Sequence, residues 1–585
     1  MPIDPPSAAH PTPALPRRAG LRQFFHAGGC TRRRLAIGLL IVISLLPVGF
    51  VLLRTADARR DLVYWDEFDT ALALVVKLKE GTTPGTFLSD LIALNNEHRM
   101  VTSRLMYAAS YWLSGTVNFA VFDWIGIAWI FVLCALLITT AGAAMRRLRL
   151  GVLLALVLFQ LEHYENFLWS GASIDHFQVV MLATGAIIAL ARGTRAGVIV
   201  GSVLATLATY TLAHGIMLWP VGAALLWYRR QRRDLAIWGG VGALVVGTFL
   251  AGFKVNSAES FAALSVDGVR QIAHYWLSIL GAVPALGFES LEPILGGVLL
   301  GLLAIALAQG GLRRERITAP VVLFAVAAAG LIAIGRAEES GGEVYSRYYI
   351  LSGVAWALTL FILLHRHTHP RRPLRLLLAA LPGLIAFNVY ADYDFADETD
   401  SWLEARDRAA TRFKQYGIDG RGPFTLHPNP ERATALLRRA EELGVYRLGQ
   451  ISQRRPFPKN AVVSNRIVYF VDEMSVNSRS AFIRGWVAIP GMHSERGQIH
   501  LLLRSAKETH LFTTISTTRP DVAKATKQPD WELSGFRFAR RRDRLPTGEY
   551  QIGFLISSAG RSEYCMTAHR LNLVGEGKAL LATGE

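Results

Sequence analysis

Long apolar runs recur along the first two thirds of the chain, between residues 35 and 391. Each run is close to the roughly 20 residues that a helix needs to cross the hydrocarbon core of a bilayer. A cluster of arginines follows every second run. Because basic residues concentrate in cytoplasmic loops, this alternation predicts about eleven membrane-spanning helices, with the N-terminus in the cytoplasm and the C-terminus outside. We therefore expect a polytopic α-helical membrane domain over residues 35–391.

Two apolar segments need separate interpretation. The first run, 35–53, follows a Pro-, Ala- and Arg-rich segment, 1–34, that we expect to be a disordered basic cytoplasmic tail. The small residues near 56–58 would suit signal-peptide cleavage, but the run is long for a signal peptide, so we interpret it as an uncleaved first span. The segment 275–287 is apolar but short and contains Pro284, which favours an interfacial or re-entrant piece.

The hydrophobic pattern changes after residue 391. Two amphipathic stretches, 396–416 and 430–443, predict an outer helical linker region over residues 392–464. From about residue 466, apolar residues recur at every second position in short runs separated by Gly, Pro, Asn and Ser, which is typical of strands. The expected strands are 467–471, 481–489, 499–503, 510–515, 535–538, 550–556 and 564–573. They predict an all-β sandwich over residues 465–577, on the periplasmic side of a bacterial inner membrane.

Composition changes this picture little. The 585 residues carry a formal net charge of +17, which in a soluble protein would suggest nucleic-acid binding. Most of the arginines lie in the clusters between apolar runs, where the positive-inside rule explains them, so we expect no nucleic-acid partner. The cysteines, Cys30, Cys134 and Cys565, are far apart and have neither metal-site spacing nor the pattern of a disulfide framework.

The predicted topology places the longest polar segment, residues 54–117, outside the membrane. Two interfacial helices are expected within it, at about 70–79 and 99–113. Just before the first, Asp66 and Glu67 stand between aromatic residues. An aromatic belt with ordinary solvated charges is the alternative interpretation of this group.

Further polar residues share the same side of the membrane in this topology. They are Glu97, His98 and Arg99 in the first outer loop, Glu165, Asn166, Trp169, Asp175 and His176 in the second, and Arg336, Arg347 and Tyr348 around the last. An ionisable residue at the centre of a span costs roughly 2.5–3.5 kcal/mol even on the lenient insertion scale. These residues lie near span ends, where the cost is smaller, and their gathering on one side predicts a single site.

The residue types suit transfer of a sugar from a lipid-linked donor. A carboxylate can deprotonate the acceptor hydroxyl, or hold a divalent metal such as Mg²⁺ or Mn²⁺ that activates it. Cationic groups can stabilise the departing phosphate. Nucleotide sugars are scarce outside the cytoplasm, so an outward-facing transferase needs a lipid donor. We expect Asp66 and Glu67 at the catalytic position, with Asp66, Glu97 and His98 as candidate metal ligands.

The phosphate of the donor is expected on Arg336, Arg347 and Tyr348. The remaining outer polar residues are expected to contact donor or acceptor: Glu97, His98, Arg99, Glu165, Asn166, Trp169, Asp175 and His176. Each has a structural alternative. Asp66 could cap a helix, Glu67 could point away from its neighbour, and the two arginines could be cations anchored at span ends. Trp169 could belong to an interfacial belt.

The arrangement of these motifs resembles the GT-C glycosyltransferases, which include protein mannosyltransferases, aminoarabinose transferases and arabinosyltransferases. The resemblance covers about residues 35–450 and consists of an acidic motif, Asp66-Glu67, in a long first outer loop, about ten further spans and an outer C-terminal domain. It implies a polyprenyl-phosphate-sugar donor, an acceptor that is a glycan, lipid or protein, and Asp66 as the catalytic or metal-associated aspartate. A second acidic metal motif of the oligosaccharyltransferase kind is not found in the sequence.

Two other classes of function fit parts of the sequence. A transporter or flippase for a lipid-linked sugar would also need outward cations, but transporters commonly show paired halves with broken helices, and no such duplication is seen. A non-enzymatic envelope scaffold, with the sandwich as a glycan-binding or docking module, would leave the outer acidic and arginine groups unexplained. Membrane lipids surround the protein in every case. The sequence does not name the sugar, the lipid carrier or the acceptor.

Overall fold

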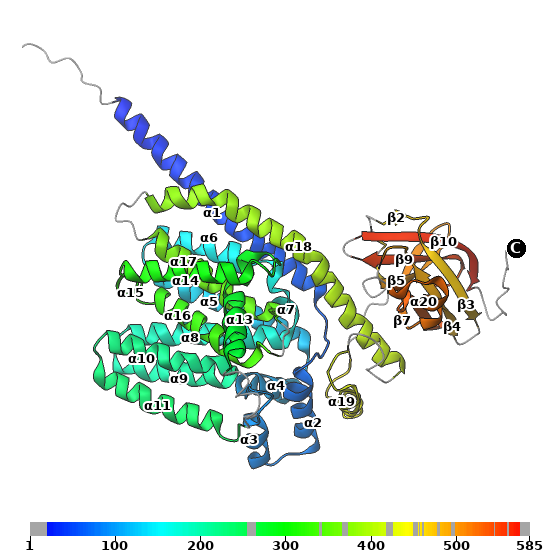
Figure 1. The fold of residues 1–585 in the computed structure, drawn as a ribbon, viewed down its shortest axis with the longest axis horizontal. Helices are drawn as coiled ribbons and strands as arrows, with labels where there is room; N and C mark the ends of the chain where they lie inside the picture. Colours follow the sequence, from blue (N-terminus) through cyan, green and yellow to red (C-terminus); the bar gives the residue numbers. More distant parts are fainter. Residues whose placement is uncertain are drawn as a thin grey trace, which may run out of the picture.

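The computed structural model describes residues 20–253, 265–338, 342–365, 372–416 and 425–448, and most of 454–573. A helical region is followed by a β region (Figure 1). Within the described residues, seven helices are long and apolar enough to cross a membrane. They are α1 (Gly20–Ala58, apolar from Ile37), α5 (Phe119–Thr140), α8 (Ser170–Ala191), α11 (Arg232–Leu250), α16 (Thr318–Arg336), α17 (Tyr349–Leu364) together with the turn before it from Ser346, and α18 (Arg372–Tyr416), whose candidate span is Pro373–Asp407. A multi-pass membrane protein follows from these lengths and compositions.

Shorter helices complete the bundle. They are α6 (Ala144–Leu158), α7 (Tyr164–Leu168), α9 (Arg195–Thr211), α10 (Leu218–Tyr228), α13 (Val266–Ala285), α14 (Glu292–Ala308) and α15 (Gly311–Arg314), with short turns η2 (Leu161–His163), η3 (Ala213–Met217) and η4 (Ser346–Tyr348). The central helix is α8, which is buried over most of its length and packs against α5 and α9. Close packing requires glycine at Gly126 of α5, where a Cβ would overlap Ser173 of α8.

The segment between α1 and α5 folds into small helices at one end of the bundle (Figure 1). They are η1 (Phe68–Leu72), α2 (Ala73–Glu80), α3 (Pro84–Ile92) and α4 (Val101–Ser114). The expected helices at 70–79 and 99–113 correspond to η1 with α2 and to α4. Helix α3 was not expected, although the sequence carries its start signal: Thr83 caps it by accepting a 3.2 Å hydrogen bond from the Thr86 amide, and Pro84 occupies its first turn.

Helix boundaries differ from the expected ones at three places. Helix α1 begins at Gly20, within the tail that was expected to be disordered to residue 34; residues 1–19 lie outside the described part. Most of segment 275–287 belongs to the longer helix α13, which ends at Ala285, and its interfacial or re-entrant position stays a prediction. The last apolar run and the stretch 396–416 lie in one helix, α18, which continues through the acidic residues 392–400. The second linker stretch forms α19 (Pro430–Glu442), capped by Asn429, whose side chain accepts from the Arg432 amide.

The C-terminal region consists of two sheets around one apolar core, as expected for a sandwich. The first sheet has the order β1-β6-β5-β9-β10-β2 and the second β3-β4-β8-β7. The strands are β1 (Arg454–Arg455), β2 (Val462–Val463), β3 (Val468–Val476), β4 (Ser480–Ala488), β5 (Gln498–Arg504), β6 (Thr509–Thr513), β7 (Ile515–Thr517), β8 (Gly535–Arg541), β9 (Glu549–Ser558) and β10 (Arg561–Asn572), with α20 (Pro520–Thr526) and η6 (Pro529–Trp531) between β7 and β8. All seven expected strands have counterparts.

Candidate functional site

One pocket gathers polar residues from five separated parts of the helical region. It encloses a cavity of about 40 Å³, within an empty space of about 500 Å³ that includes open solvent. Its lining combines carboxylates, imidazoles and two guanidinium groups: Asp66, Glu67, Thr70, His98, Met100, Trp169, Gly171, Ala172, Asp175, His176, Leu212, Arg336, Arg347 and Tyr348. Nine of the residues expected in the site therefore line one hollow, which we call the arginine pocket.

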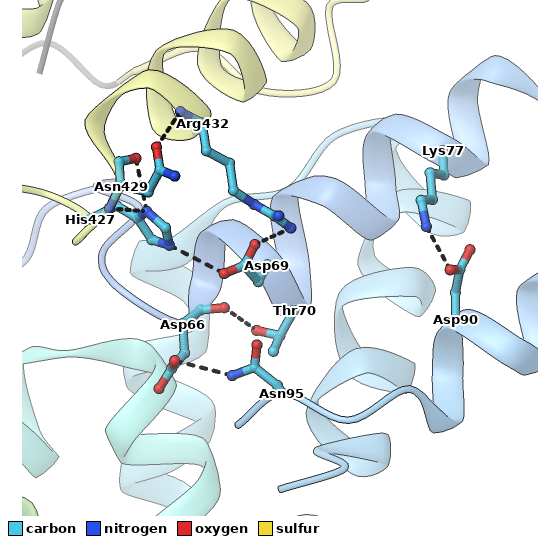
Figure 2. A network of polar contacts seen from close by, with 9 residues as sticks. All are labelled: Asp66, Asp69, Thr70, Lys77, Asp90, Asn95, His427, Asn429 and Arg432. Carbon is cyan, nitrogen blue, oxygen red and sulfur yellow. Dashed lines mark hydrogen bonds and ion pairs between the residues drawn. The ribbon is translucent and has the colours of Figure 1, made fainter. Parts of the chain in front are cut away.

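The turn that carries Asp66 is tightly constrained. Trp65, just before it, has a left-handed backbone with a φ of 48°, which is strained for a bulky residue. The main-chain carbonyl of Asp66 accepts hydrogen bonds from the amide and hydroxyl of Thr70, at 2.8 and 2.7 Å, as the chain enters the π-helix η1. The Asp66 side chain accepts a 3.1 Å hydrogen bond from the side-chain amide of Asn95 (Figure 2). π-Helical turns and backbone strain of this kind gather at functional sites.

Glu67 is fixed differently from Asp66. It is almost fully buried, with 1% of its surface exposed. Its carboxylate accepts a 2.8 Å hydrogen bond from the Tyr64 amide and a second one from the Ser170 hydroxyl. Burial raises the pKa of Glu67 from 4.5 to about 7, although the Ser170 hydrogen bond opposes the shift. Glu67 therefore ties the Asp66 turn to the start of α8, and both of its oxygens are already engaged.

This raised pKa predicts a stability change with pH. A carboxyl whose pKa is higher in the folded than in the unfolded protein stabilises the fold below about pH 4.5, and that contribution is lost as the pH rises through about 7. The shift corresponds to on the order of 3 kcal/mol at about 1.4 kcal/mol per pKa unit. Glu67→Gln, which can keep both hydrogen bonds, should be at least as stable as the wild type at pH 8. Thermal unfolding in detergent between pH 5 and 8 measures this, and an unchanged pH dependence in Glu67→Gln would contradict it.

The second acidic group holds Arg336. The Glu97 carboxylate forms an ion pair with the Arg336 guanidinium and lies 3.4 Å from Nε2 of His98. His98 Nδ1 accepts a 3.1 Å hydrogen bond from the Ala213 amide, so the neutral ring carries its proton on Nε2, toward Glu97. Burial lowers the pKa of His98, whereas for Glu97 the effect of burial is outweighed by His98 and Arg336, and its pKa is lowered. In this group the Glu97 carboxylate contacts both an imidazole and a guanidinium.

Arg347 is held by Glu165 and by aromatic rings. Its side chain lies 3.2 Å from the Glu165 carboxylate. That carboxylate also accepts hydrogen bonds from the Arg347 main-chain amide, at 3.0 Å, and from the Ser346 hydroxyl, at 3.1 Å. The guanidinium carbon is 4.2 Å from the centre of the Tyr345 ring and 5.2 Å from that of Tyr348. Asn166 donates to the Arg347 carbonyl at 3.0 Å. Glu165 and Asn166 therefore position Arg347 rather than line the pocket.

Helix α8 contributes a buried carboxylate and a histidine. Both oxygens of Asp175 are buried, and the Ser103 side chain interacts with this carboxylate; the Ser103 hydroxyl also donates to the Met100 carbonyl. His176 stacks on His214, with ring centres 6.0 Å apart, and meets Tyr348 edge to face. A buried carboxylate with so few hydrogen-bond partners is unusual, so Asp175 is a group that a bound ligand could satisfy.

Arg99 is the one expected site residue that lies apart from this arrangement. Its guanidinium donates to three main-chain carbonyls, those of Ile92, Phe249 and Ala251. It joins the outer loop to the end of α11, and the arginine pocket does not include it. A hydrogen-bonding pattern of this kind is structural, and the sequence gives no sign of it because the carbonyls of residues 249 and 251 are distant along the chain.

The sequence interpretation also missed the role of the linker before the β region. Asp69, one turn beyond Asp66, forms ion pairs with His427 at 3.2 Å and Arg432 at 2.5 Å (Figure 2). Burial alone would raise the pKa of Asp69, but these two partners lower it; the Asp69 contact in turn outweighs burial and raises the pKa of His427. The amide of Trp65 also donates to the Leu426 carbonyl at 2.8 Å. The linker therefore helps to hold the Asp66 turn in place through these contacts.

No group of three or more His, Cys, Asp or Glu side chains close enough to hold a metal ion occurs in the part of the chain that the structure describes. The candidate ligand Glu97 contacts both Arg336 and the other candidate, His98. Metal dependence therefore stays a prediction. A larger hollow, of about 1410 Å³, is lined by Trp227, Tyr228, Arg230, Arg232, Leu235 and Arg313, without any carboxylate.

Comparison with known proteins gives no match: no protein-family model, no curated protein and no solved structure is significantly similar to the chain. The functional argument therefore depends on the geometry of the arginine pocket.

Proposed function

We propose that the chain is an integral membrane glycosyltransferase of the GT-C type. It would transfer a sugar from a polyprenyl-phosphate-linked donor to an acceptor at the outer face of a bacterial inner membrane. The observation that carries this proposal is one pocket that combines the Asp66 carboxylate with the guanidinium groups of Arg336 and Arg347. The arginines come from the end of α16 and from the turn before α17, two apolar helices of membrane-spanning length.

The chemistry follows from these groups. Asp66 accepts the proton of the acceptor hydroxyl as its oxygen attacks the anomeric carbon of the donor sugar. The bond between that carbon and the phosphate oxygen breaks, and the electron pair leaves with polyprenyl phosphate. Arg336 and Arg347 stabilise the negative charge that develops on the leaving phosphate. In the proposal the polyprenyl chain lies in the membrane beside α16 and α17.

The carboxylates beside the arginines have a place in this scheme. Glu97 and Glu165 hold the two guanidinium groups in position before the donor binds. Arginine presents several donors in a planar fork, so its side chain can bind a phosphate while it still contacts a carboxylate. His98, Trp169, Asp175 and His176 would then contact the sugar, since they line the same pocket. A divalent metal, Mg²⁺ or Mn²⁺, would act at the Asp66 carboxylate if the reaction requires one.

The proposal includes a topology of about eleven spans, which adds α6, α9, α10 and α14 to the seven long helices. The N-terminus would be cytoplasmic and the β-sandwich periplasmic, where it could bind or dock a glycan. Reporter fusions after Arg149, Arg233 and Arg316 should therefore read cytoplasmic, and fusions near Arg60 and Asp394 external. A cytoplasmic reading at Asp394 would contradict the external placement of the β region.

The direct test is sugar transfer by the purified chain in detergent from a radiolabelled polyprenyl-phosphate sugar, with and without chelator. Incorporation of label into an envelope extract would support a transferase. Binding of the donor without any transfer would favour a carrier.

A further inference from the structure

A second hollow lies against the outer side of the Asp66 turn. It has a cavity volume of about 480 Å³ and is open to solvent. Its walls come from η1, α2, α3, the loop before α4, α4 itself and the linker: Asp69, Ala73, Leu74, Lys77, Asp90, Ala93, Leu94, Asn95, Asn96, Arg104, His427, Asn429 and Arg432. We call it the outer pocket. Figure 2 shows much of its polar lining, including Asn95, with Asp66 beside it.

The two pockets share one wall. Asp66 and Thr70 line the arginine pocket, whereas Asp69, between them in sequence, lines the outer pocket. The Asn95 side chain lines the outer pocket and donates to the Asp66 carboxylate at 3.1 Å. It also lies 3.7 Å from the sulfur of Met100, which lines the arginine pocket. A ligand group that displaced the Asn95 contact would reach the Asp66 carboxylate from the outer side.

The charges of the outer pocket are largely matched. Lys77 pairs with Asp90 at 2.6 Å, and Asp69 pairs with Arg432 and His427. Arg104 donates to the main-chain carbonyls of Leu91, Ala93 and Arg99. The pocket therefore offers many fixed donors and acceptors with little net charge, and only two leucine positions and two alanines supply apolar surface. This lining does not suit a lipid tail, and its cations are already engaged by Asp69, Asp90 and main-chain carbonyls, which makes it a poor site for a free phosphate.

We propose that the outer pocket binds the acceptor, and that the acceptor is a water-soluble saccharide. A sugar presents hydroxyl groups that both donate and accept hydrogen bonds, which matches the alternating amides, carboxylates and cations of the lining. It enters from the aqueous side, while the lipid donor occupies the arginine pocket, and one hydroxyl meets Asp66 at the shared wall. His427 and Arg432 make the linker part of the acceptor site. The assignment rests on the proposed transferase function.

Filling the outer pocket tests the assignment. Ala93 is exposed and lines the pocket, so Ala93→Trp should occupy the acceptor space without removing a polar group. Leu88→Trp is the matched control, because Leu88 is 57% exposed on α3, the helix that ends just before Ala93, and does not line the pocket. If Ala93→Trp does not accumulate, Ala73→Phe fills the pocket from α2. The probes for the outer pocket are neutral trisaccharides of glucose, mannose, galactose and N-acetylglucosamine, and the probe for the arginine pocket is farnesyl phosphate. Binding of each probe to the full chain in detergent is measured by saturation-transfer NMR.

At least one trisaccharide should bind the wild type and Leu88→Trp, and Ala93→Trp should weaken its binding by about tenfold or more while farnesyl phosphate binds normally. Saccharide binding that is equal in Ala93→Trp and the control would overturn the assignment, as would a wild type that binds none of the trisaccharides. Loss of farnesyl phosphate binding in Arg347→Lys concerns the donor side alone. A wild type that binds trisaccharides in the outer pocket but no farnesyl phosphate would contradict the proposed donor. It would still support the saccharide site.

Discussion

Replacing Asp66 by asparagine should lower sugar transfer by about 10²–10⁴-fold, the usual contribution of a general base. Asparagine keeps the shape of the side chain but cannot accept the proton of the acceptor hydroxyl. The fold should be little affected, because the turn is held by main-chain hydrogen bonds of Asp66 and by Glu67 rather than by the Asp66 carboxylate. Initial rates of transfer from a purified polyprenyl-phosphate sugar measure the loss, and binding of farnesyl phosphate should survive.

Asp57→Asn is the matched control for this variant. Asp57 is exposed at the end of α1 and lies outside both pockets. The Asp57→Asn variant should transfer sugar at the wild-type rate. Full activity in Asp66→Asn would exclude Asp66 as the base and would favour a transporter for the lipid-linked sugar. Glu67→Gln should be milder than Asp66→Asn, because Glu67 already accepts two hydrogen bonds inside the protein.

The second large effect is expected at Arg347. Arg347→Lys should lower transfer by about 10²–10³-fold, since removal of one donor to a developing negative charge commonly has this effect. Lysine keeps the charge but cannot form a planar fork, and it lacks the guanidinium group that lies over the Tyr345 ring at 4.2 Å. The loss should appear in farnesyl phosphate binding as well as in the transfer rate.

Arg54→Lys serves as the control, because Arg54 belongs to α1, pairs with Asp400 at 2.6 Å and lies outside the arginine pocket. It should behave as the wild type in both measurements. If Arg347→Lys also retained normal transfer and normal phosphate binding, Arg347 would be a cation that anchors the end of a helix.

The arginine pocket could largely be predicted from the sequence because one physical rule places its members. The alternation of arginine clusters assigned the polar residues to one side of the membrane, and residues as distant as Asp66 and Arg347 do line one pocket. The rule predicts on which side of the membrane a residue lies, but it does not predict which residues it contacts. It therefore could not separate Arg99, which holds main-chain carbonyls, from Arg336, which faces the pocket.

The β region was predictable for a different reason. Alternation of apolar and polar residues directly reports which face of a strand is buried, and the strands are short and clearly separated. The linker was not predictable in this way. His427 and Arg432 reach Asp69 across more than half of the chain, and no local pattern encodes that contact. A boundary was expected at residue 391, whereas α18 continues through the acidic stretch, where Asp392, Glu398 and Asp400 accept hydrogen bonds from Leu161, Tyr164 and Arg54.

The central claim is that the chain consumes a polyprenyl-phosphate sugar, and the most direct test is the lipid content of cells that lack it. Lipid extracts should be compared by mass spectrometry between wild-type cells, deletion cells and deletion cells that express either the wild type or Asp66→Asn. The account predicts that one polyprenyl-phosphate sugar accumulates on deletion, returns to its normal level with the wild type and stays high with Asp66→Asn at equal protein abundance. Unchanged polyprenyl-phosphate sugars in the deletion cells, or full restoration by Asp66→Asn, would contradict it.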